Sequence, residues 1–98
     1  MKQIFVVYET DAWHSTNHRE CTGVFTTKRA AVNAIVKNHC IELDEFFDEE
    51  EIEKTSERVL EAEARRKLRK ELEIAYQTNG HKTNYDIEVW GINEWYEN

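Results

Sequence analysis

Proline is absent from this 98-residue chain, and glycine occurs only three times. The Walker phosphate-binding loop and the dinucleotide-binding fingerprint both need several closely spaced glycines, so neither motif is present. No apolar run approaches the roughly 20 residues that cross a bilayer. We therefore expect no membrane span and no nucleotide cofactor held by a glycine-rich loop.

Cysteine is also scarce, with only Cys21 and Cys40. No apolar signal segment follows Met1, and we therefore expect a cytoplasmic protein with free thiols. The length suits one small hydrophobic core. We expect a single domain that spans residues 1–98.

Positive charge is in deficit, because 13 basic residues face 20 acidic ones and the formal net charge is -7. An acidic chain is not drawn to phosphate backbones or anionic membranes by its overall field. Four Phe, four Tyr and three Trp nevertheless supply large apolar area for a core. A folded protein with a protein partner is favoured over a nucleic-acid or membrane binder.

Three segments have the composition of strands. Residues 3–8 are rich in β-branched and aromatic side chains without polar alternation, which is typical of a central strand. Residues 20–26 form a weaker strand, in which Gly23 predicts a bulge or a close backbone approach. Residues 85–92 alternate apolar and polar side chains, as in a strand with one face in water.

Two further segments have helical periodicity. Residues 28–42 predict an amphipathic helix capped by Thr26 or Thr27. Residues 56–78 predict a long charged helix, which Asn79-Gly80 should end. At about 1.5 Å per residue, 20 or more residues give a helix of about 30 Å, which must wrap the domain edge or project toward a partner. Its apolar positions recur every four residues: Leu60, Ala64, Leu68, Leu72 and Tyr76.

The order of elements predicts a small α+β domain of the ββααβ type. A three-stranded antiparallel sheet with the order 2-1-3 results if the last strand joins the free edge of the first. The first helix would then cover one face of the sheet. Other strand orders remain open at this point.

Residues 7–15 (Val-Tyr-Glu-Thr-Asp-Ala-Trp-His-Ser), residues 19–25 (Arg-Glu-Cys-Thr-Gly-Val-Phe) and the helix start at Lys28-Arg29-Ala30-Ala31 carry a resemblance. The chain resembles a loose group of small uncharacterised proteins from bacteriophages and bacterial mobile elements, with a strand followed by a Thr-Asp-x-Trp-x-Ser loop. About 40 residues are covered. The resemblance implies a setting in phage or mobile-element biology and assigns no catalytic residue.

The loop between the first two strands holds side chains that could bind a metal or react. His14, His18 and Cys21, joined by His39 or Cys40, offer the groups that zinc prefers, although the spacing lacks paired Cys-x-x-Cys knots. Cys21 with a histidine and Asp11 could also form a thiol site. A small metal-binding or thiol-dependent protein is therefore the alternative hypothesis, while turn stabilisation by Asp11 and Ser15 is the simpler interpretation.

Charge runs mark two candidate surfaces. Residues 42–53 hold eight acidic side chains, interrupted by Phe46-Phe47 and Ile52. This run could remain a solvated turn anchored by the two rings, or imitate a nucleic-acid backbone toward a basic groove. Residues 65–70 hold five cations. They could form a solvated helix face, or, as a third hypothesis, a patch that binds the phosphates of a nucleic acid.

The leading hypothesis is a non-enzymatic, acidic protein-interaction module without a cofactor, in which the long helix could also pair two copies into a homodimer. Aromatic rings outside the predicted elements are suited to anchoring a partner. The candidate partner-binding residues are Trp13, His14, Asp48, Glu49, Glu50, Glu51, Trp95 and Tyr96.

Overall fold

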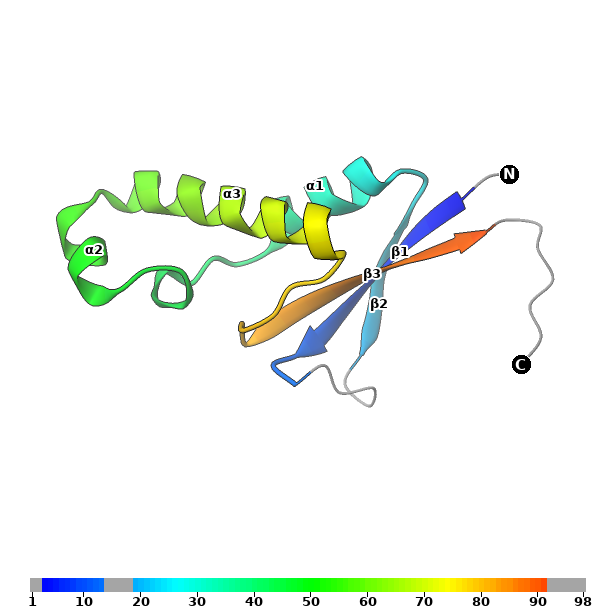
Figure 1. Ribbon diagram of the computed structural model, residues 1–98, viewed down its shortest axis with the longest axis horizontal. Coiled ribbons are helices and arrows are strands. Elements are labelled where there is room, and N and C mark those ends of the chain that lie inside the picture. Colours follow the sequence, from blue (N-terminus) through cyan, green and yellow to red (C-terminus); the bar gives the residue numbers. More distant parts are fainter. Residues whose placement is uncertain (1–2, 14–18, 92–98) are drawn as a thin grey trace.

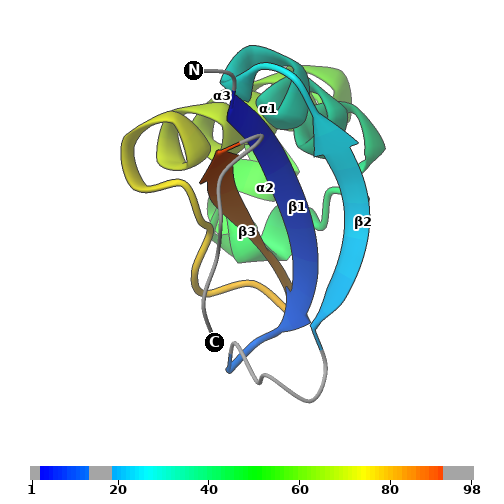
Figure 2. The ribbon, with the colours of Figure 1, turned by 90° about the vertical axis from the view of Figure 1, so that its right-hand side faces the viewer.

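A computed structural model of the protein describes residues 3–13 and 19–91, which form a sheet with helices packed against one of its faces (Figures 1 and 2). Both strand pairings are antiparallel, and the spatial order is β2-β1-β3. The predicted α+β class and the order 2-1-3 are confirmed. The strands are β1 (Gln3–Asp11), β2 (Glu20–Phe25) and β3 (Thr83–Gly91).

Each α-helix begins at a side-chain cap. Thr27 caps α1, as predicted for Thr26 or Thr27, because its Oγ1 accepts a hydrogen bond from the Ala30 amide at 3.1 Å. Asp48 and Ser56 cap the other two α-helices in the same way. The helices are α1 (Lys28–Asn38), the 3-10 turn η2 (Leu43–Glu45), α2 (Glu49–Lys54) and α3 (Glu57–Ala75).

Several element ends differ from the sequence prediction. The first helix ends at Asn38 and not at Glu42, because His39 adopts an extended backbone with a ψ of 131°. The long helix ends at Ala75, because Tyr76 takes a left-handed conformation with a φ of 58°, four residues before the expected glycine. Strand β3 starts at Thr83, which pairs with the last residue of β1.

The main core lies between the sheet and the helices. Leu68 and Leu72 of α3 are fully buried there, as predicted for the apolar stripe, whereas Tyr76, its predicted last member, caps the helix and is 37% exposed. Val7 and Ile87 close the core from the sheet side. The remaining members come from α1: Ala31, Val32, Ile35 and Val36.

A second, smaller core lies under the other half of α3, which extends beyond the sheet (Figure 1). Leu60 and Ala64 of α3 are 2% and 0% exposed, and Phe47 packs against them. The predicted long helix thus projects, but the segment of residues 41–52 of the same chain covers its apolar stripe. Two copies that paired through α3 would have to use other residues of the helix.

Strand β2 carries the irregularity expected near Gly23. The register with β1 shifts between Val7 and Tyr8, which leaves Thr22 as the extra residue of a bulge. A Cβ atom on Gly23 would lie 2.7 Å from Cε2 of Phe25, so the Phe25 ring, and not another backbone segment, fills the space beside this glycine. Among the described residues, no helix combines the length and apolarity needed to cross a membrane.

Candidate functional site

The acidic run of residues 42–53 folds around its two rings. Phe47 is 7% exposed and packs on the α3 stripe, and Nζ of Lys67 lies 4.5 Å from the centre of its ring. Because apolar residues anchor the segment, most of its carboxylates point to solvent. We call the exposed carboxylates that follow Glu42 in this run the acidic tip: Asp44, Asp48, Glu49, Glu50, Glu51 and Glu53.

The acidic tip has little internal neutralisation. Lys54 pairs with Glu50 at 2.5 Å, and both side chains are more than 70% exposed. Asp48 accepts a hydrogen bond from the Glu51 amide at 2.8 Å, which fixes the start of α2. Glu49, Glu50 and Glu51 occupy the first turn of this helix, where carboxylates interact favourably with the helix dipole. The tip is therefore an ordered display of negative charge.

Of the predicted partner-binding residues, those that the structure describes do not gather in one place. Asp48 to Glu51 lie on α2, at the end of α3 that is farthest from the sheet (Figure 1). Trp13 follows the end of β1 and is 84% exposed, and its amide donates to Asp11 Oδ1 at 3.1 Å. This bond agrees with the turn-stabilising role predicted for Asp11. The other candidates, His14, Trp95 and Tyr96, lie outside the described residues.

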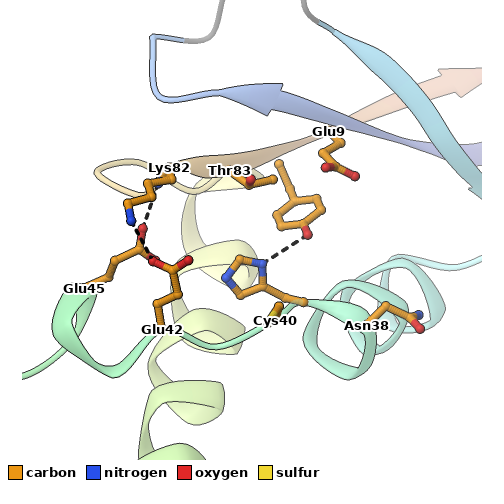
Figure 3. A pocket seen from close by; sticks show the side chains of 9 residues that line it. Glu9, Asn38, Cys40, Glu42, Glu45, Lys82 and Thr83 are labelled. Carbon is orange, nitrogen blue, oxygen red and sulfur yellow. Dashed lines mark hydrogen bonds and ion pairs between the residues drawn. The ribbon is translucent and has the colours of Figure 1, made fainter.

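A pocket of about 250 Å³ lies between the end of α1, the first residues of the acidic run, and strands β1 and β3 (Figure 3). Glu9 comes from β1, while Glu42 and Glu45 come from the first half of the acidic run. Figure 3 shows Glu9 on the opposite side of the view from these two carboxylates. The remaining lining residues are Asn38, His39, Cys40, Lys82, Thr83 and Tyr85.

His39 and Tyr85 form the uncharged wall of this pocket. Nδ1 of His39 lies 3.1 Å from the Tyr85 hydroxyl, and the two rings meet edge to face. Burial lowers the pKa of His39, as do the neighbouring His81 and Arg65. Burial and the nearby Glu9 raise the pKa of Tyr85 to about 12. Both rings are therefore neutral near pH 7.

His81 supports the pocket from behind. It is 6% exposed and lies between two carboxylates, with 3.6 Å from Nδ1 to Glu45 and 3.6 Å from Nε2 to Glu71. Its ring also stacks on Phe46, with 4.9 Å between the ring centres. Glu45 further accepts a hydrogen bond from the Lys82 amide at 2.8 Å. These contacts hold Glu45 in place at the pocket wall.

Sequence reasoning missed most of this pocket. It named His39 and Cys40 only as possible additional zinc ligands beside His14, His18 and Cys21, and it gave no site role to Glu9, His81 or Tyr85. No local signal marks them, because Tyr85 fits a strand and His81 simply follows a turn. Only the pairing of β1 with β3 and the departure of the chain from α1 bring them together.

The metal and thiol candidates do not form a site in the described part of the chain. His14 and His18 lie outside the described residues, and Cys21 is exposed on β2. Within residues 3–13 and 19–91, no group of three or more His, Cys, Asp or Glu side chains is arranged to hold a metal ion. Cys40 is exposed as well, and neither cysteine is in a disulfide.

The cationic run of residues 65–70 is largely engaged within the chain. Arg65 donates to the Val36 carbonyl and pairs with Glu61 at 2.9 Å. Arg69 donates to Asn33 at 2.5 Å, and Lys67 covers the Phe47 ring. Three of the five cations are thus tied to neighbouring side chains or carbonyls, which weakens the phosphate-binding hypothesis.

Comparisons of the chain with protein-family models, with curated proteins and with solved structures give no match.

Proposed function

We propose that this chain is a non-enzymatic protein-interaction module that presents the acidic tip to a basic surface of a partner protein. The observation that carries the proposal is the exposure of six carboxylates on a segment anchored by buried Phe47. Anchoring lowers the entropy cost of ordering the charges when a partner binds. In line with its sequence resemblance, we place the module in phage or mobile-element biology.

The partner surface that we propose is a basic groove of the kind that accommodates a nucleic-acid backbone. Clustered carboxylates produce a local negative potential, which speeds association with such a groove and makes the binding sensitive to salt. Lys54 is the one cation within residues 42–54 that could oppose this field, and it pairs with Glu50. The other carboxylates of the tip are available to the partner.

The test uses a fluorescent arginine-rich peptide and two triple variants that each remove three negative charges. One combines Glu49→Gln, Glu51→Gln and Glu53→Gln on the acidic tip. Its matched control neutralises three acids elsewhere, Glu20, Glu63 and Glu73, in the same way. Asp48 is kept because it caps α2.

Exposed charge pairs contribute about 0.2–1 kcal/mol each, so we expect the tip triple to weaken binding by about 3-fold to 140-fold. The change in the logarithm of the dissociation constant should be less than half as large for the control triple as for the tip triple. Fluorescence anisotropy at several salt concentrations measures both. Equal losses from the two triples would show that only net charge matters and would refute the tip as the binding surface.

Homodimer formation remains a prediction with a separate measurement. Val59 and Ile74 are the exposed large aliphatic residues on α3, at 55% and 73%. Light scattering at high protein concentration measures whether the chain is a monomer or a dimer. A monomer would contradict a pairing role for α3.

A further inference from the structure

We propose that the pocket lined by Glu9, His39 and Tyr85 binds the guanidinium group of an arginine side chain from the basic partner. This inference rests on the proposed function and names the residue type that the partner inserts. The pocket adjoins the acidic tip along the chain, because Glu42 and Glu45 belong to the same acidic run. A basic segment that lies along the run can therefore reach both.

The charge balance of the pocket favours a cation. Three carboxylates line it against one ammonium group, that of Lys82. Lys82 is already paired with Glu42 at 3.1 Å, and Glu45 accepts a hydrogen bond from the Lys82 amide. Glu9 is half-buried, and its carboxylate has no ion pair or side-chain hydrogen bond within the described part of the chain. An anionic ligand would face this uncompensated charge directly.

His39 supplies an independent sign of a missing ligand. Its side chain is 6% exposed, and its Nε2 has no hydrogen-bond partner among the residues that the structure describes. A buried polar atom without a partner is costly, so such an atom usually faces a ligand or water. In the tautomer whose Nδ1–H donates to the Tyr85 hydroxyl, Nε2 is an acceptor that an N–H group of a ligand would satisfy, whereas in the other tautomer Nε2–H is a donor.

The chemistry of the lining favours a guanidinium over an ammonium group. A guanidinium presents five N–H donors in a flat fork, so it can engage the Glu9 carboxylate with two bonds. It also stacks on aromatic rings such as that of Tyr85. An ammonium is a strongly hydrated point charge without this planar match.

The experiment titrates isotope-labelled protein with three short peptides that differ at one position, which is arginine, lysine or citrulline. Citrulline keeps the shape of arginine but carries no charge. We expect the arginine peptide to shift the amide signals of Glu9, His39 and Tyr85, and the citrulline peptide to bind at least tenfold more weakly. These comparisons use the wild-type chain and need no variant.

Two matched variants then locate the site. Glu9→Gln should weaken binding of the arginine peptide by about tenfold or more, as expected for loss of a charge-assisted pair. Glu53→Gln, which removes an exposed carboxylate of the acidic tip, should change the dissociation constant less than threefold. Circular dichroism checks that both variants remain folded.

The outcomes separate this inference from the proposed function. Equal effects of Glu9→Gln and Glu53→Gln would overturn the pocket and leave the acidic tip in place. A lysine peptide that binds as tightly as the arginine peptide would overturn the guanidinium assignment. If the tip triple bound the arginine peptide with the same dissociation constant as the wild-type chain, the result would support the pocket and refute the acidic tip as a binding surface. If no basic peptide binds, both proposals fail.

Discussion

Asn84→Ala should destabilise the fold and loosen the turn that carries Lys82 to the pocket. Asn84 and Thr78 are both fully buried. Thr78 Oγ1 donates to Asn84 Oδ1 at 3.0 Å, and Asn84 Nδ2 donates to the His81 carbonyl at 2.8 Å. A longer bond of 3.4 Å reaches the Asp11 carbonyl. This amide therefore ties β3, the end of β1 and the turn of residues 78–82 together.

The magnitude follows from these bonds. Two bonds of good length contribute about 0.5–1.5 kcal/mol each, and a buried group left without a partner costs about 1–3 kcal/mol. After the substitution, the Thr78 hydroxyl loses its acceptor and keeps only the bond from the Tyr85 amide, and the buried His81 carbonyl loses the Asn84 donor. We therefore expect the free energy of unfolding to fall by about 2–4 kcal/mol, out of about 5–15 kcal/mol for a domain of this size.

Urea denaturation followed by circular dichroism measures the loss. The matched control is Asn33→Ala on α1, where the amide oxygen accepts from Arg69 at an exposed position. Surface substitutions of this kind change stability by less than about 0.5 kcal/mol. A loss for Asn84→Ala no greater than that of the control would refute the network, and an unchanged slope with urea would show that both variants unfold in the same way.

Two further predictions concern the core and the pocket. Leu68→Ala should lower the free energy of unfolding by about 2–5 kcal/mol, because it opens a cavity at a fully buried position. Val59→Ala at an exposed position of the same helix is its control in urea denaturation, and similar losses would contradict the predicted packing. Because burial lowers the pKa of His39, the unfolded chain binds a proton at that ring before the folded chain does as the pH falls below about 6.5. Wild-type stability should therefore decrease from pH 6.5 downward more steeply than that of His39→Gln, and parallel curves would refute the role of His39.

Local features of the fold followed from the sequence. The cap at Thr27 joins residues three positions apart, and the stripe of Leu60, Ala64, Leu68 and Leu72 is a spacing of four positions along one helix. Hydrogen bonds and apolar spacing over so short a range are visible in the residue order itself. The strand order was also predicted, because a short list of topologies suits these elements.

Element ends were less predictable where tertiary contacts compete with local preference. His39 and Cys40 continue the helical spacing of α1, yet the chain leaves the helix there and His39 contacts Tyr85. The long helix stops at Tyr76, whose carbonyl accepts from the Ile87 amide at 2.7 Å. In both places a contact with β3 coincides with the end of helical geometry, and residue order does not display such contacts.

The sequence by itself determined the acidic run, its aromatic anchors and the elements around them, because these depend on neighbouring residues. Only the tertiary structure decided the pocket. His39 and Tyr85 are 46 positions apart, and Glu9 reaches them because β1 pairs with β3 beside the end of α1. Such a site depends on strand register and on how the helices lie on the sheet, which are properties of the whole fold and not of any one segment.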